Sequence, residues 1–176
     1  MKRPQLEHII RAAGSITGAT EVVVIGSQAI LAQFPNAPDE LLTSLDADVF
    51  TLRSPHDAEV IDGAIGELSA FHQSFGYYAH GVEIETAFLP DGWETRLVRL
   101  RTAATGNATG LCLEVHDLAA SKLLAGREKD LDYVRVLLVS HLASVGTLRE
   151  RLHTAHAPAE VVRRAVERLS LLVAED

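Results

Sequence analysis

The sequence predicts a mixed α and β fold in which a mixed or antiparallel β-sheet is flanked by helices and followed by a C-terminal helical region. Up to about residue 115, short runs of β-branched residues alternate with segments whose apolar residues recur at helical spacing. From residue 116 onward, only the helical spacing remains. The chain has 176 residues, 47% of them hydrophobic, which suffices for one core with a helical appendage. We therefore expect a core over residues 1–115 and a helical region over 116–176.

The expected elements of the core follow in chain order. The first is a helix with apolar residues from Leu6 to Ala13, which Gly14 can terminate. β-branched residues predict a buried strand at 21–25, and alternation predicts a second strand at 45–52. The remaining expected elements are helices at 27–34 and 54–72, strands at 76–89, 95–102 and 110–115, and a turn at 90–93.

The helical region has four expected segments, at 117–126, 128–141, 148–156 and from 158 onward. No apolar run approaches the ~18 residues of a membrane span, and the first residues lack the core of a signal peptide. The single cysteine, Cys112, excludes an internal disulfide framework. These features predict a cytoplasmic protein with no membrane partner.

Charge is distributed unevenly around a net value of -8. Residues 1–95 carry 14 acidic residues against 4 lysines and arginines, whereas residues 96–176 carry 10 against 12. The net charge gives no general electrostatic case for binding nucleic acid. The acidic first part could hold metal ions, and the second part could meet phosphates.

The first candidate motif is Gly26-Ser27, at the end of the expected strand 21–25. Glycine allows another group to approach the backbone closely, and serine at the start of a helix places a hydroxyl beside unpaired backbone N–H groups. Such a corner suits an anion such as a phosphate. A plain strand-to-helix turn with a serine cap is the alternative interpretation.

The second candidate motif is the pair Asp46 and Asp48. Residues two apart on a strand share a face, so both carboxylates point the same way. Their mutual repulsion is relieved by a divalent cation, and Mg²⁺ commonly takes one or two carboxylates plus oxygens of a substrate phosphate. Glu83 and Glu85 also alternate on an expected strand, so both can face the same side as the aspartates if that strand lies beside residues 45–52. Either could then be a third ligand or the base, with Glu85 favoured.

Other catalytic classes lack their signatures. The eight histidines include no HExxH motif, so they are expected to be structural or exposed, and no zinc hydrolase is predicted. There is also no G-x-S-x-G elbow and no P-loop.

Together, Gly26-Ser27 and the segment Ser44-Leu45-Asp46-Ala47-Asp48 resemble the signature of the nucleotidyltransferase superfamily related to DNA polymerase beta. The stretch DLAASKLLAGREKDLDYV, residues 117–134, is similar to a later motif of AbiEii-type and other minimal nucleotidyltransferases of bacterial toxin–antitoxin systems. The stretch LPDGWETRL, residues 89–97, also looks like these sequences.

The resemblance implies the mixed sheet of the nucleotidyltransferase fold, with NTP as substrate and Mg²⁺ as cofactor. It implies transfer of a nucleoside monophosphate to a hydroxyl of RNA, such as tRNA, or of protein, and a cognate antitoxin or toxin as a possible partner. The residues expected to take part are Gly26 and Ser27 at the phosphates, Asp46, Asp48 and Glu85 at the metal, and Lys122, Arg127, Lys129 and Asp130 at the nucleotide, with Lys122 also catalytic. Asp130 or Asp132 could orient the cations.

Two alternatives remain open at the level of sequence. One is a catalytically weak or inactive nucleotidyltransferase-like module that works by binding a partner. The other is a transferase for small molecules, as in antibiotic nucleotidyltransferases. The charged residues of 117–134 also fit an amphipathic helix pair with solvated charges.

Overall fold

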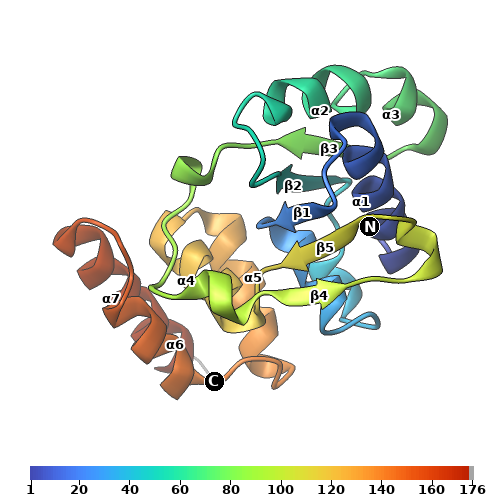
Figure 1. Ribbon diagram of the computed structural model, residues 1–176. Coiled ribbons are helices and arrows are strands. Elements are labelled where there is room, and N and C mark those ends of the chain that lie inside the picture. The colour runs from blue at the N-terminus through green and yellow to red at the C-terminus, as the bar shows by residue number, and fades with distance from the viewer. Residues whose placement is uncertain (175–176) are drawn as a thin grey trace. The chain divides into compact units, whose positions relative to one another are not determined.

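The computed structural model describes residues 1–174 and divides the chain into two compact units (Figure 1). Unit 1 comprises Met1–Thr86 and Leu97–Leu113. Unit 2 comprises Ala87–Arg96 and the chain from Glu114 onward. Unit 2 therefore combines a short segment from the first part of the chain with the chain that follows residue 113.

Unit 1 is built on a five-stranded mixed sheet with the order β3-β2-β1-β5-β4. β1 pairs antiparallel with β2 and parallel with β5, β2 pairs parallel with β3, and β4 pairs antiparallel with β5. The mixed sheet and its flanking helices confirm the fold class expected from the sequence. The strands are β1 (Glu21–Val24), β2 (Asp46–Phe50), β3 (Tyr78–Gly81), β4 (Val98–Leu100) and β5 (Thr109–Cys112).

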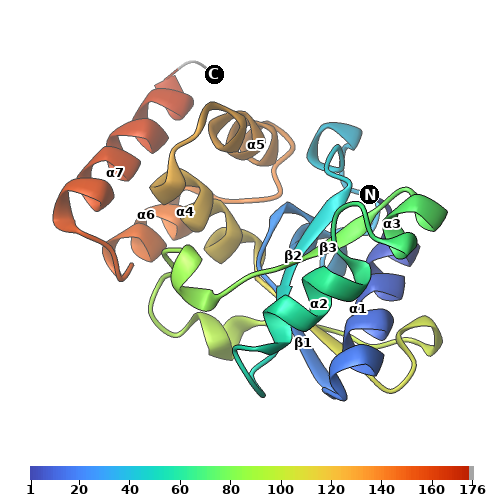
Figure 2. The ribbon, with the colours of Figure 1, turned by 90° about the horizontal axis from the view of Figure 1, so that it is seen from above.

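The α-helices of unit 1 are α1 (Arg3–Thr17), α2 (Asp57–Ile65) and α3 (Ala70–Phe75), which Figure 2 shows from above. Four short 3₁₀-helices complete the unit: η1 (Ser27–Ala32), η2 (Asp39–Leu41), η3 (Ile84–Thr86) and η5 (Ala103–Thr105). α1 packs against α2 and against β1 and β5, whereas η1 packs against β2, β4 and β5.

The strand pairings show that α1 and the Asp46–Asp48 pair lie on opposite faces of the sheet. A Cβ added to Gly110 would lie 2.5 Å from Ile10 of α1, so Gly110 faces α1. Gly110 pairs with Val22, and Val24, two residues on, pairs with Val49. Because side chains alternate along a strand, Val49 faces α1 and Asp48 faces away from it.

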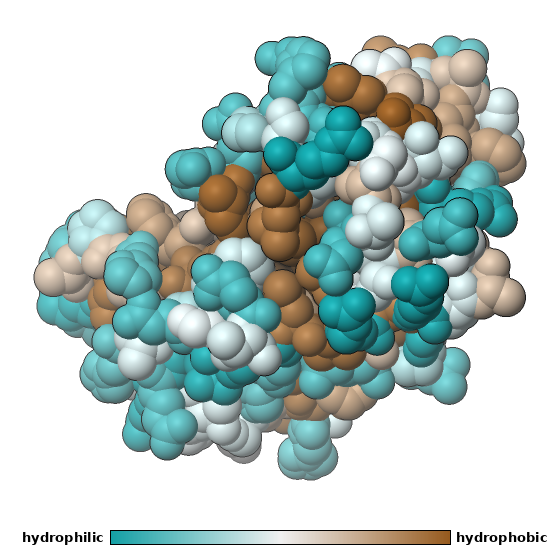
Figure 3. Space-filling model, in the orientation of Figure 1, coloured by the Kyte–Doolittle hydropathy of each residue, from teal (hydrophilic) through white to brown (hydrophobic). Residues whose placement is uncertain are grey.

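An aromatic cluster joins α1 and α3 to the start of β3. His8 and Phe71 have ring centroids 4.9 Å apart, and Phe71 contacts Phe75 and Tyr77. Burial lowers the pKa of His8, whose Nδ1 lies 2.8 Å from the Tyr77 hydroxyl. Phe75 remains half exposed, and Figure 3 shows hydrophobic side chains at the surface in the region of α2 and α3, among hydrophilic ones.

Unit 2 is helical. It contains η4 (Trp93–Arg96), α4 (Val115–Ala125), α5 (Glu128–Val139), α6 (Val145–His153) and α7 (Ala159–Ala174), and α4 packs against the other three α-helices. At its centre, Asp117 is fully buried and accepts hydrogen bonds from Arg96 Nε and Nη2 at 2.8 and 2.9 Å. Arg151 Nε lies 3.1 Å from the same carboxylate. This buried ion cluster ties η4 to α4 and α6.

Several expected element boundaries are wrong. Gly14 does not end the first helix but lies buried inside it, and the helix ends at Gly18, whose φ of 71° suits glycine. The helix expected over 54–72 is two helices, separated at Gly66–Ser69. The strand expected over 76–89 ends at Gly81, because the chain then turns into η3. Among the described residues, no helix combines the length and apolar composition that a membrane span requires.

Candidate functional site

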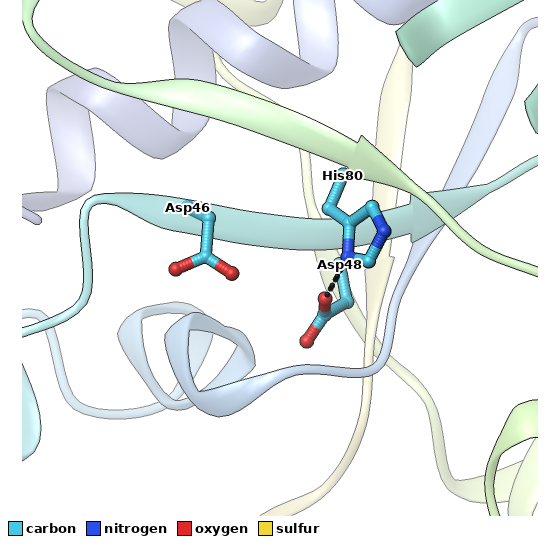
Figure 4. A group of neighbouring side chains, drawn as sticks. All are labelled: Asp46, Asp48 and His80. Carbon is cyan, nitrogen blue, oxygen red and sulfur yellow. Dashed lines mark hydrogen bonds and ion pairs between the residues drawn. The ribbon is translucent and has the colours of Figure 1, made fainter. Parts of the chain in front are cut away.

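Asp46 and Asp48 stand on one face of β2, as their spacing predicts. The burial of the strand alternates over its first four residues, with Ala47 and Val49 buried and the two aspartates half-buried. Figure 4 shows both carboxylates leaving β2 on the same side. Their like charges therefore converge on one partly solvated surface of unit 1.

His80 joins this pair from the neighbouring strand. β2 and β3 run parallel, with Asp46 beside Tyr78 and Asp48 beside His80. His80 Nδ1 lies 3.3 Å from Asp48 Oδ1. One ligand atom from each of Asp46, Asp48 and His80 can be chosen so that all three lie within 4.8 Å of one another. Two carboxylates and one imidazole thus form a cluster with the dimensions of a metal site.

The dimensions can be compared with those of a bound ion. Two ligand atoms at right angles around an ion about 2.1 Å away are about 3.0 Å apart, and opposite ligands are about 4.2 Å apart. The Asp48–His80 separation of 3.3 Å fits the first case. The side chains of His80 and Asp48 are 55% and 34% exposed, so further positions around an ion would be open to substrate or water.

Gly26 makes room for the Asp48 carboxylate. A Cβ added to Gly26 would overlap Asp48 Oδ2 and would lie 2.8 Å from its Cγ. The φ of Gly26 is -79°, so the residue is required by this close approach and not by its backbone conformation. The structure therefore links the Gly-Ser motif directly to the second aspartate.

Ser27 begins η1, a 3₁₀-helix of six residues, where the sequence suggested a longer helix. Its hydroxyl lies 3.5 Å from Gln28 Nε2. Ser27 is partly exposed, and its role at a phosphate stays a prediction.

The local electrostatics favour a cation. Burial raises the pKa of Tyr78, and the negative charges of Asp46, Glu67 and Asp48 raise it further. The hydroxyl of Ser44 donates a hydrogen bond to Asp46 Oδ1, which orients that carboxylate. The donor set of two carboxylates therefore fits the divalent ion that the sequence implied.

Glu83 and Glu85 do not lie on the strand that carries His80. β3 ends at Gly81, Glu83 follows it in a loop, and Glu85 is an exposed residue of η3. The alternation argument that placed both glutamates on the face of the aspartates is therefore wrong. Glu85 as third ligand or base has no support from strand geometry and stays a prediction, while His80 occupies the position beside Asp48.

The cations expected at the nucleotide lie in unit 2. Lys122, on α4, places its Nζ 3.1 Å from Asp130 Oδ1 and 4.4 Å from the centre of the Tyr133 ring. Arg127 Nε donates to Asp130 Oδ2 at 2.6 Å. Asp130 therefore contacts two of these cations, and it was one of the two aspartates, Asp130 or Asp132, expected to orient them. The other option, Asp132, pairs instead with Arg135 at 2.6 Å, and Lys129 is exposed on α5.

Burial raises the pKa of Asp130, but hydrogen bonds from Arg127 and the charge of Lys122 outweigh it and hold the pKa below its usual range. Asp130 is therefore held in its charged form, and its ion pairs with Lys122 and Arg127 lie within unit 2. The catalytic role expected for Lys122 stays a prediction, as do the nucleotide contacts of Arg127, Lys129 and Asp130.

Sequence reasoning missed His80. The segment Tyr78–Gly81 alternates, so Tyr78 and His80 share a face, but nothing local says which strand lies beside it. The one available signal was a histidine at an alternating position of an expected strand, in a protein with an aspartate pair on another strand.

The chain was compared with known families and proteins. A family model described as nucleotidyltransferase of unknown function (DUF6036) matches residues 4–170. No curated protein and no solved structure matched the chain. The match spans both units, including the Gly26-Ser27 corner, the aspartate pair and α4 to α7. The chain therefore belongs to this family of nucleotidyltransferases.

Proposed function

We propose that the protein is an enzyme that transfers a nucleoside monophosphate from an NTP to an acceptor hydroxyl with the help of a divalent metal ion. The observation that carries this proposal is the placement of Asp46 and Asp48 on one face of β2, where the Asp48 carboxylate lies against Gly26. Paired carboxylates on a rigid strand bring metal-binding oxygens together, and the missing side chain at Gly26 leaves space for one of them.

In this proposal, different residues of unit 1 bind the metal and the phosphates. Asp46 and Asp48 would hold the metal, which when bound neutralises charge on the triphosphate. Ser27, next to Gly26, would contact the β and γ phosphates through its hydroxyl and backbone amide. The acceptor oxygen forms a new bond to the α-phosphorus while the bond from that phosphorus to pyrophosphate breaks. The acceptor proton leaves to solvent or to a nearby base, for which Glu85 remains the candidate.

The acceptor class is proposed from the resemblance of residues 117–134 to AbiEii-type nucleotidyltransferases. That resemblance supports RNA, such as tRNA, or protein as acceptor. It also supports a place in a bacterial toxin–antitoxin pair, with a cognate protein as partner. Membership of the family supports nucleotidyl transfer in general, and it does not specify the acceptor, the toxin–antitoxin role or the partner.

A second candidate function is a nucleotide-binding module with weak or no catalysis. The observation that favours it is His80, which stands beside Asp48 where a third carboxylate would complete an all-oxygen metal site. Such a module would bind nucleotide and metal, and it would act through a protein or RNA partner.

The test is a thermal-shift titration with each of the four NTPs, with and without Mg²⁺ or Mn²⁺. Binding to the folded state alone adds about 2.7 kcal/mol of stability at a hundredfold excess over Kd. For the wild type we expect a rise in melting temperature with NTP that depends on the metal, and Asp48→Asn should abolish this rise. The control Asp39→Asn, which changes an exposed aspartate of η2, should show the same rise as the wild type. Equal shifts in the wild type and both variants would show that Asp48 does not take part in nucleotide binding. The absence of a shift with every NTP in the wild type would refute nucleotide binding itself.

Ser27→Ala separates the phosphate role from the metal role. We expect it to weaken binding of a triphosphate more than binding of a monophosphate, because the hydroxyl is assigned to the β and γ phosphates. Equal losses would remove Ser27 from that position. Transfer of radiolabelled NMP to tRNA and to protein then distinguishes the enzyme from the binding module.

A further inference from the structure

The third member of the cluster is an imidazole, and this fact bears on which metal the site selects. Mg²⁺ prefers oxygen ligands, whereas imidazole suits first-row transition metals. At a given site of nitrogen and oxygen donors, affinity rises from Mn²⁺ toward Cu²⁺. A site with two carboxylates and one histidine therefore differs in selectivity from an all-carboxylate site.

Three features make His80 a candidate ligand. Its backbone is fixed beside Asp48 by the parallel pairing of β2 with β3. Its Nδ1 faces Asp48 Oδ1 at 3.3 Å, close to the separation of neighbouring ligands around one ion. Its side chain is 55% exposed, so packing in the core does not explain its position.

We propose that His80 is the third protein ligand of the metal site and that the site takes a divalent first-row transition-metal ion in preference to Mg²⁺. This rests on the metal site of the proposed function and refines its ligand set. Asp46 and Asp48 supply oxygen donors from β2, and His80 supplies a nitrogen donor from β3. The remaining coordination positions face solvent, where the oxygens of a triphosphate can enter.

The proposal is tested by metal binding alone, without nucleotide or catalysis. Free Mn²⁺ is titrated with the metal-free protein, and its aqueous electron paramagnetic resonance signal reports the unbound ion. Mg²⁺ is then added as competitor. Loss of a residue that merely orients a ligand typically costs about 10–100-fold in metal affinity. We expect His80→Ala to weaken Mn²⁺ binding by at least about tenfold while changing the affinity for Mg²⁺, obtained from the competition, much less.

Two further variants sharpen the test. His80→Asp restores an all-oxygen set and should reduce the preference for Mn²⁺ over Mg²⁺ by about tenfold or more. His56→Ala is the matched control: His56 is exposed and pairs with a single carboxylate, Glu59, at 3.0 Å, outside the cluster. It should bind both ions like the wild type. Nitrogen hyperfine coupling in the pulsed spectrum of bound Mn²⁺ should be present in the wild type and absent in His80→Ala.

The outcomes distinguish this inference from the proposed function. If Asp48→Asn weakens Mn²⁺ binding but His80→Ala does not, His80 is not a ligand, and the aspartate metal site stands without it. If Asp48→Asn also leaves Mn²⁺ binding unchanged, the metal site fails and the proposed function fails with it. Because the side chains of His80 and Asp48 are 55% and 34% exposed, we expect both variants to fold.

Discussion

Gly26→Ala should weaken metal binding at the proposed site while leaving the fold intact. The φ and ψ of Gly26, -79° and -176°, are ordinary for alanine, so the new residue adds no backbone strain. The added Cβ would overlap Asp48 Oδ2 and would lie 2.8 Å from Cγ and 3.0 Å from Cβ of that aspartate. Carbon atoms prefer about 3.5–4.0 Å, so the Asp48 side chain must turn away.

The cost to stability is small because the neighbour can move. Asp48 is one-third exposed, and displacing a side chain from its rotamer costs about 0.5–1.5 kcal/mol. Alanine offsets part of this by about 0.4–1 kcal/mol, because it restricts the unfolded chain. The net change should stay within about 1 kcal/mol, or about 2–4 °C in Tm. Metal affinity should fall by about tenfold or more, because the proposed ligand Asp48 is displaced.

Mn²⁺ titration and urea unfolding of the same variant test this reasoning. The matched control is Gly63→Ala on α2, where an added Cβ meets no atom within 4 Å. It should stabilise the protein by about 0.5–1 kcal/mol and leave Mn²⁺ affinity unchanged. Wild-type Mn²⁺ affinity in Gly26→Ala would refute the link between this glycine and Asp48. Loss of more than about 3 kcal/mol of stability would show that Gly26 serves the fold.

Two further predictions concern the fold. Gly81→Ala adds a Cβ 2.7 Å from the carbonyl carbon of Ala58 and 2.9 Å from its Cα. Because these are main-chain atoms that cannot rotate away, we expect a destabilisation of about 1–3 kcal/mol in urea unfolding. An unchanged unfolding midpoint would contradict this contact. Asp130→Asn should destabilise by about 1–3 kcal/mol at pH 7, because it removes the charge that Lys122 and Arg127 share. Since the pKa of Asp130 is depressed in the folded state, its stabilisation is complete above the unfolded pKa of about 3.9 and is lost as pH falls through the folded value. The stability gap between wild type and variant should therefore narrow below about pH 4, and a gap constant from pH 7 to pH 3 would refute this assignment.

The local part of the site could be predicted from the sequence. The period of two on a strand places Asp46 and Asp48 on one face whatever the strand's neighbours are. The β-branched run before Gly26 predicts β1, and the change to helical spacing after residue 115 predicts the helices of unit 2. Each of these inferences depends on residues within a few positions of one another.

The missed features depend on long-range contacts. His80 reaches the cluster only because β3 pairs parallel with β2 in one register, and the sequence does not encode that register locally. Gly81, the last residue of β3, lies so close to the Ala58 carbonyl of α2 that an added Cβ would clash with it, and the local sequence pattern does not reveal this contact either. Glu85 was assigned by extending the alternation past that point, where the chain has already left the sheet.

The charged clusters of the two units differ in whether folding alone gives a reason for their presence. In unit 2, Lys122 and Arg127 neutralise Asp130, a buried carboxylate that would be costly without partners, so folding alone gives both cations a reason to be present. In unit 1, Asp46 and Asp48 bring like charges together on a half-exposed strand face. Gly26, which has no side chain, leaves room for the Asp48 carboxylate. The two carboxylates repel each other and contribute no apolar packing, although Ser44 donates a hydrogen bond to Asp46 and His80 lies beside Asp48. The divalent cation that we propose would account physically for the aspartate pair, the glycine and the neighbouring histidine together.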